Sequence, residues 1–219
     1  MSESMKKRII LGSASPRRRE LLEQIGLEFE IVVSDAREHY KSTRPEEIVR
    51  ELALMKAEHV AKEVERREKE RAEQASIPGL DTGEAHLRNV VILGADTIVV
   101  RDGQILGKPS DEEAAFSMLK SLQGRMHQVY TGVAVLDFDG NGKRHTISHA
   151  EETKVYVHEM TDEEIRRYIA AGESMDKAGA YGVQGRFAAY IDRIEGDYYN
   201  VVGLPVAYLY HAVKGRLEE

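Results

Sequence analysis

The chain has 219 residues, a net charge of −7 at neutral pH and no cysteine. This length suits one ordinary domain or two small lobes sharing a core, and with 42% hydrophobic and 32% charged residues the chain can form a packed globule. The lack of cysteine excludes disulfides, thiolate catalysis and cysteine-bound zinc, and it suits a cytoplasmic protein. The acidic balance argues against nucleic acid as a partner. No apolar run reaches the roughly 18 residues of a membrane span, and we expect no secretory signal.

Apolar runs and turn signals predict alternating strands and helices. The predicted strands are 8–12, 29–33, 90–94, 97–100, 104–106, 129–138, 145–157 and 188–194. Predicted helices begin at Pro16 after the cap Ser15, within 43–46, at Ser110, at Thr161 and at Leu204. Asp102-Gly103 predicts a hairpin turn. Because hairpins interrupt the alternation, the sequence predicts an α/β fold with a mixed sheet.

One segment is almost entirely charged. Residues 62–73 alternate in sign, and Glu58/Lys62, Glu63/Arg67 and Glu65/Lys69 are spaced i, i+4. This pattern indicates a solvated helical extension rather than an arm for a partner. Residues 75–89 are typical of a surface loop. We interpret 62–89 as an insertion within one domain that spans residues 1–219, not as a domain boundary.

The first strand runs directly into Ser13-Ala-Ser-Pro-Arg-Arg18. A helix N-terminus with free N–H groups, hydroxyls and the two guanidiniums of Arg17 and Arg18 suits a phosphate chain. The Walker spacing is absent. A capped helix with solvated arginines is the alternative.

Lys56 stands near the middle of an apolar helical arc formed by Ile48, Val49, Leu52, Met55 and Val60. A lysine in that position either extends its ammonium to water or meets an anion, since an unpaired buried ammonium is costly.

A carboxylate, Asp96, follows the apolar run 90–94, and we expect it at the end of a strand, where α/β sheets present ligands. Capping of its own turn is the alternative. Lys108 taken alone is a surface lysine, and the glycines of 176–185 either admit a ligand closely or serve a tight loop. The histidines form no convincing metal set. Asp96 and Glu38 would instead suit Mg²⁺ beside phosphates.

Five motifs in this order resemble those of the Maf (septum-formation) family. They are Ser-Ala-Ser-Pro-Arg-Arg at 13–18, Gly-Ala-Asp-Thr at 94–97, Gly-Lys-Pro at 107–109, Asp-Lys-Ala-Gly-Ala-Tyr-Gly-Val-Gln-Gly at 176–185 and Gly-Asp-Tyr-Tyr at 196–199. The resemblance runs from about Ile9 to Leu217, apart from a longer stretch near 63–89. It implies an inosine-triphosphatase-like fold with two lobes around a cleft.

The resemblance also implies an activity, the hydrolysis of nucleoside triphosphates to the monophosphate and pyrophosphate. It places the general base on Asp96, and a divalent metal, Mg²⁺ or Mn²⁺, on Glu38 and Asp96. Arg17, Thr97 and Gln184 match the subgroup that acts on dTTP and UTP, and a homodimer is implied. The substrate-binding residues it implies are Ser13, Arg17, Arg18, Lys56, Thr97, Lys108 and Gln184. The alternative is a nucleotide-sensing protein of cell division with little turnover.

Overall fold

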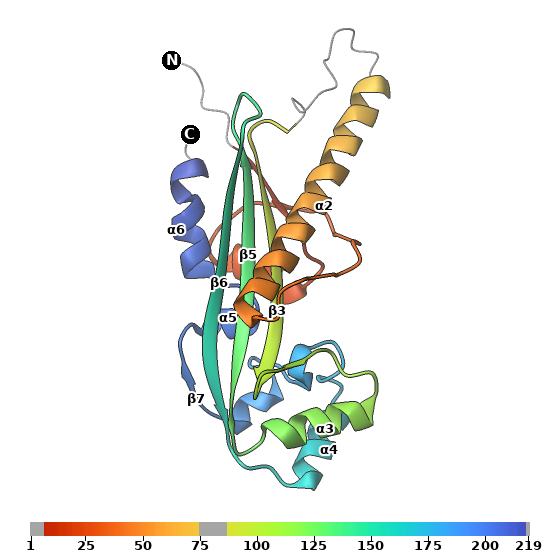
Figure 1. Cartoon of the computed structure of the whole chain (residues 1–219), viewed down its shortest axis with the longest axis vertical. Coiled ribbons are helices and arrows are strands. Elements are labelled where there is room, and N and C mark those ends of the chain that lie inside the picture. Colours follow the sequence, from red (N-terminus) through yellow and green to blue (C-terminus); the bar gives the residue numbers. More distant parts are fainter. Residues whose placement is uncertain (1–6, 75–86, 218–219) are drawn as a thin grey trace.

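The computed structural model describes residues 7–74 and 87–217 (Figure 1). The strands are β1 (Arg8–Leu11), β2 (Glu30–Ile31), β3 (Val90–Arg101), β4 (Gln104–Leu106), β5 (Met126–Phe138), β6 (Arg144–Val157) and β7 (Ile191–Glu195). The helices are α1 (Pro16–Gln24), α2 (Pro45–Gln74), α3 (Glu112–Leu122), α4 (Asp162–Ala170), α5 (Tyr198–Val202) and α6 (Val206–Leu217), with short 3₁₀ segments η2 (Ala178–Ala180) and η3 (Arg186–Tyr190). The predicted class, α/β with a mixed sheet flanked by helices, is confirmed.

The sheet runs in the order β2-β1-β3-β5-β6-β7, and β4 pairs with β3 outside this path. β1 is parallel to β2 and β3, whereas the other pairs are antiparallel. Figure 1 shows that β3, β5 and β6 run the length of the molecule, with α2 and α6 beside one half and α3 and α4 beside the other. The molecule therefore has two lobes joined by continuous strands. The cleft expected between them stays a prediction.

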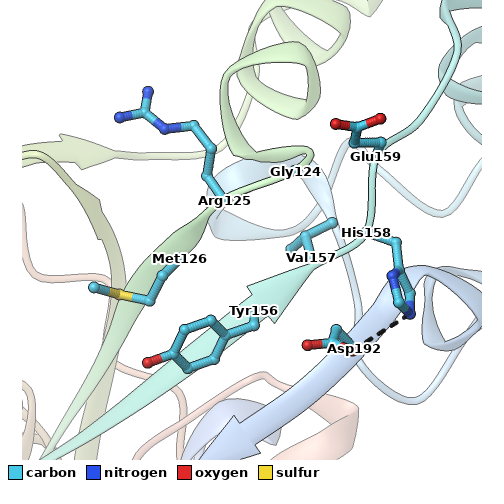
Figure 2. A pocket seen from close by; sticks show the side chains of 8 residues that line it. All are labelled: Gly124, Arg125, Met126, Tyr156, Val157, His158, Glu159 and Asp192. Carbon is cyan, nitrogen blue, oxygen red and sulfur yellow. Dashed lines mark ion pairs between the residues drawn. The ribbon is translucent and has the colours of Figure 1, made fainter.

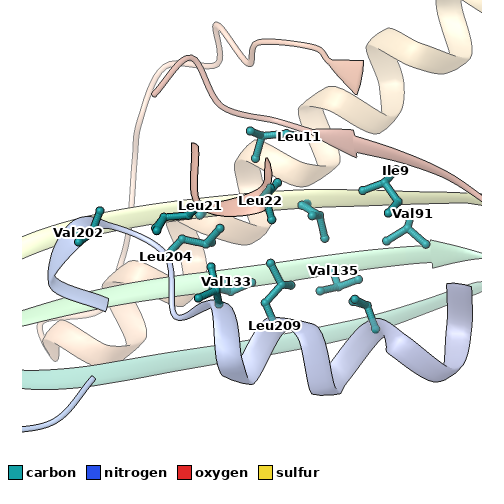
Figure 3. Close-up of a cluster of buried hydrophobic side chains, with 14 of the residues drawn as sticks. Ile9, Leu11, Leu21, Leu22, Val91, Val133, Val135, Val202, Leu204 and Leu209 are labelled. Atoms are coloured by element: carbon teal, nitrogen blue, oxygen red, sulfur yellow. The ribbon is translucent and has the colours of Figure 1, made fainter. Parts of the chain in front are cut away.

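Alternate residues of the central strands build a core on each face of the sheet, as the two-residue period of a strand requires. One face carries Ile9, Leu11, Val91 and Leu93 against α1, α5 and α6, and Figure 3 shows Leu22, Val133 and Leu209 meeting there. The other face packs against α2. A third cluster joins α3 and α4 to the far ends of β3, β5 and β6. Both faces of β3 are thus covered, which explains its nearly unbroken apolar sequence.

Helix α2 lies unusually close to the sheet at two glycines. A Cβ atom built on Gly132 would lie 2.0 Å from the backbone oxygen of Val49, and one built on Gly94 would lie 2.2 Å from that of Ala53. Both obstructing atoms belong to the helix backbone, so the helix could not yield locally. These glycines therefore set the depth at which α2, and the side chains it carries, approach β3.

We expect Gly132→Ala to lower the free energy of unfolding by about 1–3 kcal/mol, because the added methyl overpacks a rigid contact. Thermal and urea denaturation measure this change. Gly215→Ala is the matched control, since a Cβ there meets nothing within 4 Å, and it should be neutral or slightly stabilising. Equal stabilities for the two variants would contradict the close-packing interpretation.

Several predicted boundaries are wrong. The predicted strands 90–94 and 97–100 are one strand, β3, and the strand predicted at 29–33 contains only Glu30–Ile31. The cap of α3 is Asp111, whose carboxylate accepts from Ala114 N–H, rather than Ser110. The strand predicted at 188–194 begins later, after η3, and the final helix is preceded by the separate α5. The Thr161 capping box and the hairpin at Asp102-Gly103 are confirmed.

The charged segment belongs to α2, which continues to Gln74. Of the predicted i, i+4 pairs, Glu63–Arg67 forms at 2.7 Å, whereas Glu58 pairs with Arg144 of β6 instead. Most of the loop predicted at 75–89 lies outside the described residues. Within residues 7–74 and 87–217, no helix has the length and apolar character to cross a membrane.

Candidate active site

The candidate site lies at a gap along one edge of β3. The last residue pair between β1 and β3 is Leu11–Leu93, and β4 first pairs with β3 at Val99. Among the described strands, none pairs with residues 94–98 on this edge. The chain leaves β1 toward this gap through Gly12 and Ser13, and β4 leads toward it from the other end into Gly107-Lys108. The topology thus brings three predicted motifs, around residues 13, 96 and 108, to one stretch of strand.

Asp96 points to the α2 face of β3 and meets the predicted lysine of that helix. Lys56 Nζ lies 2.5 Å from Asp96 Oδ1 and 2.7 Å from Glu38 Oε1. The side chains of Lys56 and Asp96 are only 16% and 11% exposed, whereas that of Glu38 is 58% exposed. Of the two interpretations of Lys56, the anion contact is the one observed. Two carboxylates from different segments therefore share one ammonium group.

Thr97 is the next residue and points to the opposite face, where α1 lies. Arg18 Nη2 donates to Thr97 Oγ1 at 3.0 Å, Nη1 donates to Ser13 Oγ at 3.0 Å, and Nε donates to Gly203 O at 2.9 Å. Burial lowers the pKa of Arg18; the nearby Asp96 and Glu38 carboxylates oppose this shift, whereas Arg17 adds to it. An arginine remains charged under such a shift. Arg18 is thus a fixed, partly buried cation at the gap.

Arg17 connects this edge to the glycine-rich loop 176–185. Its Nη1 lies 3.2 Å from Asp176 Oδ2. Burial acts to raise the pKa of Asp176, but hydrogen bonds from Lys177 and Arg17 outweigh it and lower that pKa below its usual value. Arg17 is therefore held across the chain rather than free in solvent.

The loop also contacts the strand of the third motif, since Gly179 N donates to Gly107 O at 3.0 Å. Lys108 and Gln184 are both exposed. Within residues 7–74 and 87–217, the side chains of Lys108 and Gln184 make no hydrogen bond or ion pair. The structure therefore forms two contact sets on opposite faces of β3, one of Lys56, Asp96 and Glu38 and one of Arg18, Ser13 and Thr97. Arg17 is tied to the glycine-rich loop, and Lys108 and Gln184 lie on adjoining segments.

Behind the glycine-rich loop, His127 of β5 supports Tyr181. His127 Nε2 lies 2.7 Å from the Tyr181 hydroxyl, and both side chains are buried. Burial lowers the pKa of His127 to about 4, so the ring is neutral at physiological pH. This contact fixes the base of the loop while its outer residues, including Gln184, face solvent.

The prediction that Asp96 follows the end of a strand is wrong. Asp96 lies within β3, opposite Gly132 of β5. The other edge of β3 is unpaired at Asp96 because β1 stops short there, a feature that depends on strand lengths rather than on local sequence. Sequence reasoning also missed Asp176, Thr131, Asn200 and Gly203 as contacts of this region. A weak signal existed for two of them, since Thr131 interrupts an apolar run and Asn200 directly follows the fifth motif.

A divalent metal is implied by the family resemblance, and the donor set fits one. Asp96 and Glu38 already converge on a single cation, the ammonium of Lys56, and carboxylate oxygens are the donors that Mg²⁺ and Mn²⁺ prefer. Residues 7–74 and 87–217 contain no group of three or more His, Asp or Glu side chains able to hold a metal. Two carboxylates would therefore need phosphate or water oxygens to complete the coordination.

An open pocket of about 410 Å³ lies elsewhere, at the ends of β5 and β6 (Figure 2). It is lined by residues 124–126, 156–159 and Asp192, and within this lining His158 Nε2 lies 3.6 Å from Asp192 Oδ1. None of its lining residues is a predicted site residue, so this pocket is separate from the candidate active site.

Comparison with known proteins agrees with the five motifs. The family model described as Maf-like protein matches residues 8–216. The chain belongs to the Maf family. The Maf relatives named dTTP/UTP pyrophosphatase in Lachnoclostridium phytofermentans and Agathobacter rectalis are each 47% identical over 206 residues, covering 94% of this chain and 93% and 96% of the relatives. The solved nucleoside-triphosphatase / dITP/XTP pyrophosphatase of Mycobacterium abscessus matches 96% of this chain and 94% of its own at 12% identity; its TM-score of 0.37 is too low to support an argument.

Proposed function

We propose that this Maf protein hydrolyses dTTP and UTP to the monophosphate and pyrophosphate. The observation that carries the proposal is the placement of Asp96 and Thr97 on opposite faces of one unpaired strand edge, each beside a partly buried cation, Lys56 and Arg18. A site with two fixed cations and an acidic group suits a phosphate chain attacked by water. Relatives at 44–47% identity over nearly the full chain are named dTTP/UTP pyrophosphatase.

In this mechanism Asp96 accepts or orients the proton of the water that attacks the α-phosphorus. Arg18, Lys56 and Lys108 neutralise the charge of the triphosphate and of the leaving pyrophosphate, and Ser13 hydrogen-bonds a phosphate oxygen. A triphosphate competes with Asp96 and Glu38 for the ammonium of Lys56, which releases the base. Fixed charges in a partly dehydrated site need no reorganisation during the reaction, which makes them effective.

Glu38 and Asp96 would hold the divalent metal. When bound, Mg²⁺ or Mn²⁺ supplies Lewis acidity to phosphate oxygens and neutralises their charge. The partial exposure of Glu38 leaves its carboxylate able to reach a metal that arrives with the nucleotide.

The test of the activity is pyrophosphate release across a panel of triphosphates, with and without Mg²⁺ or Mn²⁺. Release from dTTP and UTP supports the hydrolase. Tight binding of either nucleotide without release, at enzyme concentrations near that of the substrate, supports the nucleotide-sensing alternative instead.

Selectivity among pyrimidines is proposed to rest on Gln184. An amide held in one orientation pairs with the carbonyl and N–H of thymine or uracil, whereas cytosine presents its donor and acceptor in the reverse order and leaves a polar group unpaired. We expect kcat/KM for UTP to exceed that for CTP by about ten- to a hundredfold, which corresponds to about 1–3 kcal/mol. Gln184→Glu should lose this margin.

The measurement is kcat/KM for UTP and CTP in the parent and in both variants, Gln184→Glu and the control Gln104→Glu. The control makes the same change at another exposed glutamine and should keep the margin. Equal values for CTP and UTP in the parent protein would refute the selectivity while leaving the hydrolase intact.

We also propose that residues 1–219 form one Maf-like domain with an insertion near 62–89. We further propose that the protein forms a homodimer and is located in the cytoplasm. Size-exclusion chromatography with light scattering tests the oligomeric state.

A further inference from the structure

A partly buried line of hydrogen bonds leads from Arg18 across one face of the sheet. Arg18 Nη2 donates to Thr97 Oγ1, which lies 2.9 Å from Thr131 Oγ1, and Thr131 Oγ1 donates to Asn200 O at 3.0 Å. Each threonine has one hydroxyl proton. When the Thr131 proton goes to the Asn200 carbonyl, the Thr97 proton is left for Thr131 Oγ1 at 2.9 Å or for Gly203 O at 3.4 Å, and the Thr97 oxygen accepts from Arg18. The line ends on the backbone of α5.

Helix α5 has only five residues and is held by the side chain of Asn200. Asn200 Nδ2 donates to Val129 O at 3.0 Å and to Thr153 Oγ1 at 2.9 Å. A backbone carbonyl only accepts, so this contact fixes which end of the amide faces β5. Asn200, Thr131 and Thr153 are all fully buried. Asn200 therefore sets the position of α5 against the sheet.

The end of α5 provides a second contact to Arg18. Gly203 follows the helix with a φ of +127°, a conformation that L side chains rarely adopt, and its carbonyl accepts from Arg18 Nε. The guanidinium is thus held on one side by Gly203 at the end of α5, and on another by Thr97 of β3, whose hydroxyl is linked to α5 through Thr131. Ser13 holds the third nitrogen and comes from a different segment.

We propose that Thr131 and Asn200 are positioning residues for the reaction, which hold the Arg18 guanidinium in register with the triphosphate. Neither side chain reaches the gap itself, since both are buried and their partners occupy the space between. This proposal rests on the proposed function, because it takes Arg18 to bind phosphate. On this proposal, the fifth motif, 196–199, and the following Asn200 hold the Arg18 guanidinium in place without contacting the substrate.

Thr131→Val removes both hydrogen bonds at nearly constant volume. We expect KM for dTTP to rise about tenfold, the effect of misplacing one charged hydrogen-bond donor, with a smaller change in kcat. Thr131→Ser restores the hydroxyl and should restore KM. Ile165→Val is the stability control, because Ile165 is buried in the separate α3–α4 cluster, and it should leave KM unchanged. Should Thr131→Val fail to fold, Thr131→Ala, which cannot overpack, takes its place.

A double-mutant cycle with Arg18→Lys separates positioning from a general structural effect. If Thr131 acts through Arg18, Thr131→Val should change KM little further in the Arg18→Lys background. A full tenfold effect in that background would overturn the proposal, as would an unchanged KM in Thr131→Val itself.

Hydrogen exchange of the Arg18 Nε–H, followed by NMR with ¹⁵N-arginine, tests the positioning without any turnover. We expect exchange to be at least several-fold faster in Thr131→Val than in the parent and in Ile165→Val. If the parent hydrolyses no triphosphate, the proposed function fails, and this exchange measurement still decides whether Thr131 holds Arg18. Equal exchange in all three proteins would overturn the positioning itself.

Discussion

Asp96→Asn is expected to lower kcat for dTTP hydrolysis by on the order of 10²–10⁴, the usual contribution of a general base. The asparagine is isosteric and keeps an oxygen toward Lys56, which lies 2.5 Å away in the parent, so the local packing should survive. What is lost is the ability to take a proton, together with one of the two carboxylates that would hold the metal. Steady-state pyrophosphate release measures the effect.

A matched control exists on the neighbouring strand. Asp137 of β5 is also a buried carboxylate paired with a lysine, Lys7, at 2.9 Å. Its register partner on β3 is Val91, five residues from Asp96, or about 17 Å along the strand. We expect Asp137→Asn to lower stability and to leave kcat near the parent value. If Asp96→Asn, folded, hydrolysed dTTP at the parent rate, Asp96 would not be the base.

The sequence was sufficient to predict Lys56 because helical phasing is local. Five apolar residues of α2 define one face, and a lysine in its middle either reaches water or meets an anion. The choice between these outcomes required a partner from a segment 40 residues away, Asp96. The pattern therefore predicted that Lys56 was unusual, and only the packing of α2 on β3 showed why.

Asp96 was found for a reason that proved incorrect. Gly94 and Ala95 suggest the end of a strand, but Gly94 is there because a side chain would collide with the backbone of α2. The strand continues, and its edge beside Asp96 is unpaired because β1 ends at Leu11 and β4 begins pairing at Val99. A local propensity cannot show how far a neighbouring strand extends.

The sequence marked Thr131 and Asn200 only weakly and could not show that they contact each other. Thr131 and Asn200 are 69 residues apart, and their hydrogen bond depends on α5, a helix of five residues with no amphipathic pattern. A single threonine in a buried strand is equally compatible with a hydroxyl bonded to its own backbone. Only the tertiary structure brings both residues into the line of hydrogen bonds that ends at Arg18.

Lys56→Met is the second substitution from which we expect a large loss, on the order of 10²–10³ in kcat/KM, comparable to the removal of one preorganised donor from other active sites. The methionine keeps most of the apolar stem of this α2 side chain and removes the charge. Without the ammonium, the triphosphate meets the carboxylates of Asp96 and Glu38 with no cation from α2 between them. The effect should therefore appear in KM as well as in kcat.

Lys7→Met is the control, because Lys7 is also a buried lysine paired with a buried aspartate, and Asp137 keeps a second partner in Arg216 at 2.9 Å. This variant should lose stability without losing kcat/KM.

Direct titration with Mn²⁺, followed by its EPR signal in the absence of nucleotide, separates two roles of Lys56. If the ammonium serves the substrate, Mn²⁺ should bind Lys56→Met at least as tightly as the parent, since two carboxylates are freed, while turnover falls. A folded Lys56→Met with parental kcat/KM would show that Lys56 only neutralises Asp96 and Glu38, and the phosphate-binding role would then rest on Arg18 and Lys108.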